Sequence, residues 1–301
     1  MIGRGRLIVC ALAAWAIISW QSWQPGSATA APSSTCQSVG ISATLNGFAT
    51  VGVGPEGWVE NMGFDGHGGM WVSELELNRL VRFDAHGDPG ASLILASPGA
   101  SGLEADGRMF ALYGDSDLGT PPAGVVTFDP TAATPVAKPF VSGFTMANGG
   151  AVDAAGNLYV ADTLTPGILK YSPTGVLDRA FEQATQITGA DGVAIDGSTL
   201  YVTQITSASA TIVQVPLNDP KAHTVLASLA PLIGPDDLAI GPDGALYVAL
   251  ASGQLVRVNR STGAACIVIG PITVTAIAAT AAPYFQFIKF FTFCAPRMMR
   301  A

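Results

Sequence analysis

The stretch FDGHGGMWV at residues 64–72 decides the fold, because similar stretches recur along the chain. Each copy combines an apolar residue, an aspartate or its substitute, a glycine-containing turn and a short apolar or aromatic run. The other copies are LEADGRMFAL (103–112), VDAAGNLYV (152–160), the shorter IDGSTLYV (195–202) and IGPDGALYV (240–248). This pattern predicts a strand, a tight turn and a returning strand in every copy.

A second apolar run follows each copy and completes a repeat of about forty to fifty residues, the length of a propeller blade. These runs are LVRFD (80–84), VVTFD (125–129), ILKYS (168–172), IVQVP (212–216) and LVRVN (255–259). One such sheet cannot bury both of its faces, whereas several sheets packed around an axis can. A β-helix would have a shorter repeat, and a sandwich would not repeat its turn. We therefore predict an all-β, six-bladed β-propeller with five clear blades and a degenerate closing blade.

The C-terminal residues 265–301 are atypical of the repeat. They lack its signature, and the chain has no charged residue from 261 to 288. A degenerate closing blade, a hydrophobic tail and an altered reading frame are the alternatives. Pro271 and Pro283 argue against one spanning helix, and so favour a closing blade. That blade would also take an N-terminal strand near residues 48–53.

The first thirty residues differ from the rest of the chain. Arg4 and Arg6 precede an apolar run, and Ala28-Thr29-Ala30 resembles a cleavage site, so we predict a signal peptide at 1–30 and a propeller domain at 31–301. An uncleaved anchor is the alternative, but the apolar run of about fourteen residues is shorter than the roughly twenty that span a bilayer. We expect a secreted protein, extracellular or periplasmic, without a stable membrane span after cleavage.

Composition narrows the choice of partners. The net charge of −8 and the pI of about 4.7 disfavour nucleic acid as a partner. We expect a monomer that takes a small-molecule substrate or ligand. Cys36, Cys266 and Cys294 remain after cleavage, and an oxidising compartment allows one disulfide among them, with the pairing left open.

Oxygen-bearing side chains recur five positions before the turn in four of the repeats, namely Glu60, Asn148, Asp191 and Asp236. The second copy has Gly99 there, which contributes no ligand. Because the innermost strands of a propeller start at one mouth of its channel, we expect these four side chains to converge. Three carboxylates and an amide suit a hard divalent cation, most of all Ca²⁺. The alternative is that these residues are ordinary turn formers.

Three further aspartates, Asp115, Asp129 and Asp162, follow strands, and we expect them to cap turns. Asp237 is a candidate second carboxylate at the mouth, although alternation along a strand would turn it away.

The runs ENMGFDGHGGMWVSE (60–74), ANGGAVDAAGNLYVAD (147–162) and ADGVAIDGSTLYV (190–202) resemble motifs of the SMP-30/gluconolactonase/LRE-like propellers, which are close to NHL-repeat propellers. The resemblance covers roughly residues 54–259. It implies hydrolysis of lactones or related esters, with one divalent cation held at the channel mouth by Glu60, Asn148 and Asp236.

Asp191 stands where that family more often has asparagine, so the catalytic base is either Asp236 or Asp191. A non-catalytic NHL-type propeller that binds a ligand or partner is the alternative function. The chain has three histidines and no G-x-S-x-G motif, which disfavours serine hydrolases and histidine-dependent propeller lyases.

Overall fold

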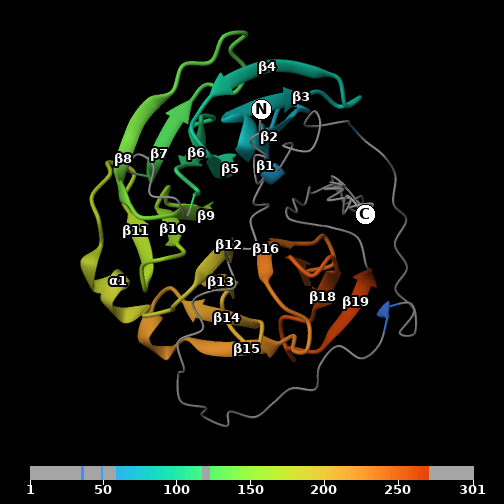
Figure 1. Cartoon of the computed structure of the whole chain (residues 1–301). Helices are drawn as coiled ribbons and strands as arrows, with labels where there is room; N and C mark the ends of the chain where they lie inside the picture. The colour runs from blue at the N-terminus through green and yellow to red at the C-terminus, as the bar shows by residue number, and fades with distance from the viewer. Residues whose placement is uncertain (1–34, 37–48, 50–58, 117–122, 271–301) are drawn as a thin grey trace, which may run out of the picture.

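The computed structural model describes residues 35–36, 49, 59–116 and 123–270, and its five antiparallel sheets follow one another around a common axis (Figure 1). The first sheet contains β1 (Val59–Phe64), β2 (Met70–Glu74), β3 (Arg79–Phe83) and β4 (Pro89–Ile94), and the second contains β5 (Pro98–Leu103), β6 (Met109–Tyr113), β7 (Ala123–Phe128) and β8 (Lys138–Phe144). The third contains β9 (Ala147–Val152), β10 (Leu158–Asp162) and β11 (Ile168–Tyr171). The fourth contains β12 (Ala190–Asp196), β13 (Thr199–Gln204), β14 (Thr211–Pro216) and β15 (Thr224–Ser228), and the fifth contains β16 (Pro235–Ile240), β17 (Leu246–Leu250), β18 (Leu255–Val258) and β19 (Ala265–Ile269).

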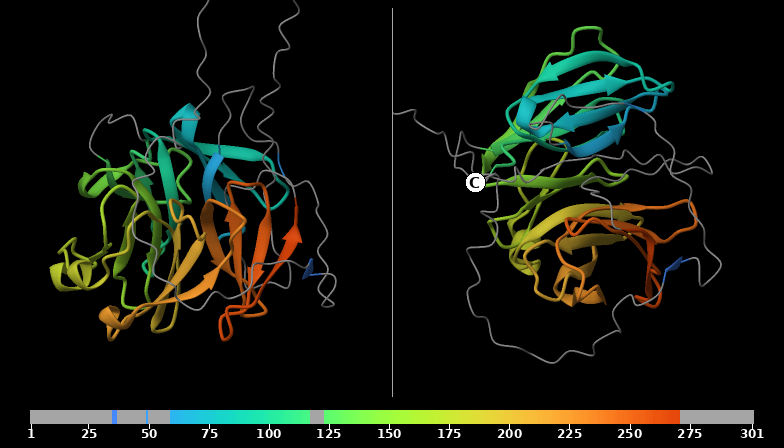
Figure 2. Two further views of the ribbon diagram at one scale, coloured as in Figure 1. Left: turned by 60° about the horizontal axis from the view of Figure 1, so that its bottom comes forward. Right: turned by 45° about the vertical axis from the view of Figure 1, so that its right-hand side comes forward.

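Each sheet is one blade, so the five clear blades predicted from the sequence are confirmed. Figure 2 shows that the strands run from one face of the ring to the other. The third blade has three strands, and the short helix α1 (Arg179–Ala184) lies beside its outer strand β11. Two 3-10 turns, η3 (Leu75–Leu77) and η4 (Pro220–Ala222), complete the described elements. Among the helices in these residues, none is long and apolar enough to cross a membrane.

The repeated aspartate closes the turn between the first two strands of a blade. Asp65 accepts hydrogen bonds from the backbone N–H groups of His67 at 2.7 Å and Gly69 at 2.8 Å. Asp153 does the same for Ala155 and Asn157 in the third blade. An aspartate that accepts its own turn's N–H groups fixes a tight reversal without a long loop. This local bond explains why the signature recurs with so little variation.

The core lies between the blades, because the second strand of each blade is covered on both faces. All five residues of β2 are buried. Trp71 points toward the second blade, where its ring meets the edge of Phe128 at a centroid distance of 5.0 Å. On β6, Met109 faces back toward Trp71, while the next residue, Phe110, packs against the third blade. Alternate side chains therefore join neighbouring blades, and each blade stabilises the next.

Glycines let the innermost strands approach one another at backbone distance. A Cβ on Gly149 of β9 would lie 1.9 Å from the carbonyl oxygen of Asp191 on β12. A Cβ on Gly192 of β12 would lie 2.6 Å from the carbonyl oxygen of Asp236 on β16. These distances are too short for any side chain, so glycine is required at both positions. The innermost strands consequently lie close together around the axis of the ring.

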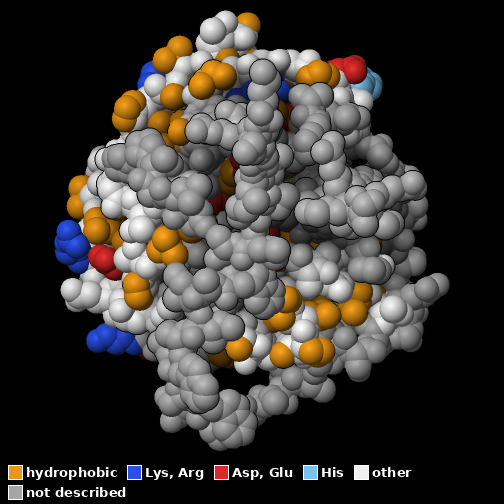
Figure 3. All heavy atoms as spheres, in the orientation of Figure 1, with side chains coloured by type: hydrophobic (Ala, Val, Ile, Leu, Met, Phe, Trp, Pro, Cys, Tyr) orange, Lys and Arg blue, Asp and Glu red, His pale blue; other side chains and the backbone are white. Residues whose placement is uncertain are grey.

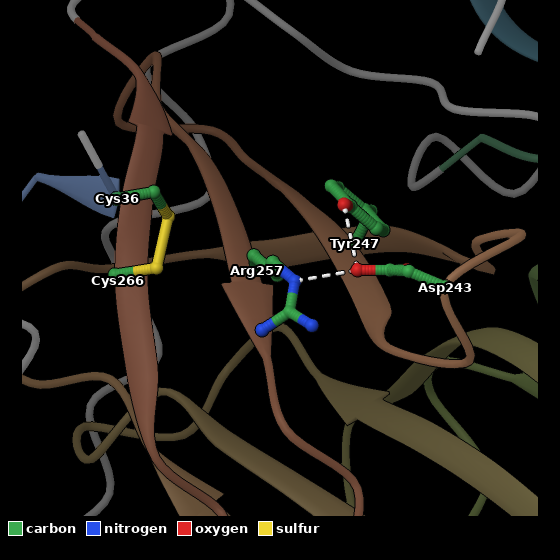
Figure 4. The surroundings of a disulfide bond; sticks show 5 residues. All are labelled: Cys36, Asp243, Tyr247, Arg257 and Cys266. Carbon is green, nitrogen blue, oxygen red and sulfur yellow. Dashed lines mark hydrogen bonds and ion pairs between the residues drawn. A yellow bond between two sulfur atoms is a disulfide. The ribbon is translucent and has the colours of Figure 1, made fainter. Parts of the chain in front are cut away.

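A disulfide joins the start of the described chain to its last strand (Figure 4). Cys36 pairs with Cys266 of β19 across a sequence separation of 230 residues, and the adjacent Thr35 forms a parallel bridge with Ile267. This pairing answers the question that the cysteine spacing left open. The N-terminal segment is thereby attached to the outer edge of the fifth blade.

Most of the predicted closing blade lies outside the described residues. The segment assigned to it, 265–301, starts inside the fifth blade, because residues 265–269 form β19. Residues 271–301 of that segment and nearly all of 48–53 lie outside the described residues, as does the predicted signal peptide at 1–30. The sixth blade and the domain boundaries therefore stay predictions.

Loss of the disulfide should lower the stability of the protein. Cys36→Ser should reduce the free energy of unfolding by about 2–5 kcal/mol, because the crosslink closes a very long loop. Thermal unfolding with and without reductant measures this. The double variant Cys36→Ser/Cys266→Ser should match the single variant and should not respond to reductant. A double variant that still responds to reductant would contradict this assignment.

A methyl group at the axis should be far more harmful than one on an outer strand. Gly149→Ala should cost at least about 1–3 kcal/mol, because the added methyl group overlaps a backbone oxygen. Gly90 on β4 is the matched control, since its nearest atom to an added Cβ is 3.7 Å away. Gly90→Ala should change stability by less than about 0.5 kcal/mol. Denaturant unfolding of both variants gives the comparison, and equal losses would show that the close approach is not a constraint.

Candidate functional site

The four residues predicted to converge occupy the same place in their blades. Glu60, Asn148, Asp191 and Asp236 are each the second residue of an innermost strand, and all are buried, with exposed fractions of 7%, 8%, 0% and 5%. The Nδ2 group of Asn148 donates to Glu60 Oε1 over 3.5 Å. The structure thus brings together side chains from the first, third, fourth and fifth blades. Their chemical roles are not decided by this placement.

A register shift occurs at this position in all five innermost strands. The pairing with the second strand slips between Val59 and Met62 in the first blade and between Pro235 and Leu238 in the fifth. The same shift follows the strand starts in the other three blades. A bulge re-aims side chains and breaks strict alternation. Neighbouring residues of one strand can therefore both face the channel.

Because of the bulge, the expectation that Asp237 points away from the channel is wrong. Strict alternation would turn this residue away, but Asp237 Oδ2 accepts a hydrogen bond of 3.1 Å from Asn61 Nδ2. The two residues come from β16 and β1, which belong to the fifth and first blades. Both line a cavity of about 330 Å³ that is bordered by all five innermost strands. This cavity extends the site along the channel.

Asp115 is the site residue that the sequence did not reveal. It was expected to cap a turn, yet it is 3% exposed and its Oδ1 accepts a hydrogen bond of 3.3 Å from Asn148 Nδ2. By contrast, Asp129 and Asp162 do accept backbone N–H groups as expected. Asp115 lies in the loop after β6, outside the repeat phase used to find the others. The one sequence signal was the glycine directly before Asp115, since Gly114 has a φ of 81° and turns the chain there.

Hydroxyl groups from second strands and their following loops support the mouth. Thr163 Oγ1 donates to Asp191 Oδ1 at 2.8 Å. Thr203 Oγ1 accepts from the backbone N–H of Gly192 at 2.7 Å and also donates to the carbonyl oxygen of Asp236. Ser73 Oγ donates to the carbonyl oxygen of Gly99 at 2.6 Å. These bonds fix the bulged backbone on which the acidic residues stand.

Burial without compensating donors makes the acidic groups weak acids. Burial, followed by the charges of Glu60 and Asp191, raises the pKa of Asp115 well above its ordinary value. The same causes raise the pKa of Asp236. Burial raises the pKa of Asp191 to about 7, although hydrogen bonds from Asp236 and Thr163 oppose the rise. None of the ion pairs found in the described residues neutralises these three aspartates.

Figure 3 shows acidic atoms near the centre of the face drawn in Figure 1, while the lysine and arginine side chains visible there lie toward the periphery.

The donor set fits a divalent cation in its chemistry. Asp115 Oδ2 and Asp191 Oδ2 are buried without a hydrogen-bond partner. Carboxylate and amide oxygens are the ligands that Ca²⁺ prefers. However, no three acidic, histidine or cysteine side chains of the described chain form a ready-made group that could hold a metal ion. The orphaned oxygens still favour a cation, because carboxylates without a counter-ion repel one another and do not draw together in advance.

The three histidines take no part in this cluster. His67 and His86 are exposed in turns, and the ring Nδ1 of half-buried His223 contacts the carbonyl oxygen of Pro220. Histidine-dependent chemistry at the mouth is therefore unsupported by these residues.

Comparison with solved structures places the chain among β-propellers. A gluconolactonase from Xanthomonas campestris is 18% identical, with a TM-score of 0.61 over 74% of this chain and 80% of that one. A calcium-binding protein, regucalcin, from Agrobacterium tumefaciens is 17% identical, with a TM-score of 0.56 over 80% of this chain and 85% of that one. Virginiamycin B lyase from Staphylococcus aureus is 13% identical, with a TM-score of 0.56 over 78% of both chains. The fold is a β-propeller.

Comparison of the sequence with protein families and curated proteins matches only a short part of the chain. The strictosidine synthase-like N-terminal family model matches residues 223–258, which span β15 to β18. No curated protein matches the sequence. Because all three structural neighbours share less than a fifth of their residues with this chain, they establish the fold and not the activity.

The stability of the cation-free protein should depend on pH through Asp191. Its pKa is about 7 in the folded chain against an ordinary value of 3.8, so the folded state holds this proton more tightly than the unfolded state does. The contribution of Asp191 to the free energy of unfolding should be largest below pH 3.8 and should fall as the pH rises from 3.8 to about 7. Melting temperatures in chelator between pH 4 and pH 8 measure this.

Asp191→Asn should make that fall shallower, because asparagine does not titrate, while Asp115 and Asp236 still contribute to it. Asp129→Asn, which changes an exposed turn residue, should leave the fall between pH 4 and pH 7 in place. Addition of Ca²⁺ should raise the melting temperature most at the higher pH, where the cluster carries the most charge. An Asp191→Asn variant with the same slope as the unaltered protein would contradict the assignment.

Proposed function

We propose that this protein is a secreted, monomeric hydrolase of lactones or related esters that depends on a divalent cation, and that this cation is Ca²⁺ in view of the oxygen-only donor set. One observation carries the proposal: four buried acidic side chains and one amide meet at the start of the innermost strands, with carboxylate oxygens left unpartnered. The structural similarity to a gluconolactonase and to a calcium-binding regucalcin supports it.

Glu60, Asn148, Asp191 and Asp236 would hold the cation. When bound, it would polarise the carbonyl group of the substrate and stabilise the negative charge that develops on attack. The hydroxyl of Thr163 holds Asp191 Oδ1 in place, so that this side chain has a fixed direction. The amide group of Asn148 is likewise oriented by the carboxylates that accept its hydrogen bonds.

Asp236 is the residue that we assign as the base that removes a proton from water. Asp191 is fully buried and is already bonded to Thr163, whereas Asp236 retains an exposed fraction of 5%. A base must reach the water that it activates. Asp236 is the better placed of the two for this reason, and Asp191 serves as its neighbour in the cation-binding set.

The acidity of the site also favours an uncharged substrate. Asp115, Asp191, Asp236 and Asp237 add negative charge around the mouth and the channel. An anionic substrate would be repelled, whereas a lactone or ester is neutral until it is hydrolysed. The carboxylate formed by hydrolysis would then be repelled from the site, which favours product release.

A panel of uncharged lactones and esters tests the activity. Protein purified from the expressed full chain should hydrolyse at least one of them, and chelator should abolish turnover while Ca²⁺ restores it. Asp236→Asn should lower kcat by about 100-fold or more, the usual contribution of general base catalysis. Asp243→Asn is the control, because this aspartate lies in the turn after β16 and pairs with Arg257.

Asp191→Asn separates the two candidate bases. If Asp191 serves mainly to hold the cation, excess Ca²⁺ should restore much of the activity of Asp191→Asn but none of that of Asp236→Asn. The reverse pattern would transfer the role of base to Asp191. Calcium binding without turnover of any substrate in the panel would instead indicate a non-catalytic, ligand-binding propeller.

A further inference from the structure

Asp115 has an environment unlike that of the acidic residues that end the second strand in the first and third blades. Glu74 ends β2 and pairs with Arg79 at 2.5 Å. Asp162 ends β10 and accepts the backbone N–H groups of Thr145 and Met146, both at 2.8 Å. These two acidic residues are the last of the second strand in their blades, whereas Asp115 lies two residues beyond the end of β6. Both have donors that satisfy them.

No such donor compensates Asp115. Its Oδ1 accepts a long bond from Asn148 Nδ2, its carboxyl group contacts the acidic Glu60, and its Oδ2 is buried without a hydrogen-bond partner in the described chain. It also lies beside Glu60, another acidic group that has no proton to donate when ionised. A buried carboxylate oxygen that lacks a donor is costly unless it has another ligand. The orphaned oxygen lies among the other acidic groups of the mouth.

The innermost strand of the second blade has no side chain at the position from which the other blades reach the site. Its innermost strand carries Gly99 where other blades carry Glu60, Asn148, Asp191 or Asp236. A Cβ on Gly99 would lie 2.8 Å from the carbonyl oxygen of Ala147 and 2.9 Å from that of Asn148. No side chain fits there, so the blade cannot supply a ligand from the position that the other blades use.

The loop after β6 brings Asp115 to the mouth instead. The backbone N–H of Gly114 donates to Ala96 O and that of Asp115 donates to Ser97 O, each at 3.0 Å. Gly114 itself has a φ of 81° and would collide with Ala123 if it carried a side chain. These contacts fix the direction in which Asp115 leaves the backbone.

We propose that Asp115 is the oxygen ligand that the second blade contributes to the cation site, in place of the ligand that Gly99 cannot provide. The inference rests on the cation site of the proposed function, and it adds a ligand from outside the repeated position. The site then draws on all five described blades. Oδ2 is the ligand atom, while Oδ1 holds the amide group of Asn148.

Calcium binding measured without substrate tests this role. Isothermal titration of the full-length product with Ca²⁺ alone should show at least tenfold weaker binding by Asp115→Asn, since the ligand loses its charge. The melting temperature of Asp115→Asn in chelator should be equal to or higher than that of the unaltered protein. Asparagine removes a buried acid and supplies an N–H group that can donate to Glu60.

Two control variants distinguish a ligand from a structural residue. Asp162→Asn alters the acidic residue that ends β10 in the third blade, and it should lower the melting temperature because one of the two backbone N–H groups loses its acceptor. Glu76→Gln removes an exposed carboxylate of the first blade and should change neither property. Asp115→Ser provides a second, smaller replacement and should weaken calcium binding as Asp115→Asn does.

Unchanged calcium affinity in both Asp115 variants would overturn the inference and leave the proposed hydrolase intact, because turnover is assayed separately. Weaker binding accompanied by a melting temperature in chelator as low as that of Asp162→Asn would also overturn it, since the role would then be structural. Absence of calcium binding by the unaltered protein would remove both this ligand and the cation-dependent part of the proposed function.

Discussion

The close packing of the innermost strands is the constraint on which the site depends. Gly149 and Gly192 allow each strand to touch the carbonyl group of the residue that bears the next blade's acidic side chain. A larger residue at either position would push the strands apart and widen the ring. Because the acidic residues directly precede or oppose these glycines, the spacing of the backbone sets the spacing of the carboxylates. The architecture and the site are therefore the product of one short-range contact repeated around the axis.

This packing concentrates like charges in a place that water barely reaches. Asp115, Asp191 and Asp236 are each no more than 5% exposed, and burial raises the pKa of all three. A sequence selected for stability alone would place apolar residues there, since buried acids without donors oppose folding. The blades supply the compensating stability through the apolar contacts between sheets and through the disulfide at the ends of the described chain. Strain of this kind is typical of functional sites.

The parts of this structure that sequence predicts well are those encoded by local, repeated interactions. The turn aspartates such as Asp65 bond to their own backbone, so the signature marks every blade. The phase of that signature located Glu60, Asn148, Asp191 and Asp236 correctly at equivalent strand positions. Asp115 was expected to cap a turn, because a loop and not the repeated strand position brings it to the mouth. Asp237 was expected to point away, because the bulge in β16 breaks the period of two that a regular strand has. Cys36 and Cys266 could not be paired from sequence, because nothing local connects residues so far apart.

The two ends of each innermost strand show how environment, and not residue type, decides what an acidic side chain does. Asp65 closes the turn after β1, and although burial opposes it, the N–H groups of His67 and Gly69 together with Arg82 lower the pKa of this carboxyl. Asp236 begins β16 at the opposite end of the blade, with no such donors, and burial raises its pKa. Asp65 and Asp153 therefore find their donors within their own blades and stabilise those blades. The acidic groups at the mouth have neighbours from other blades, as the bond between Asn148 and Glu60 shows, so the proposed divalent cation would balance the charge of several blades at once.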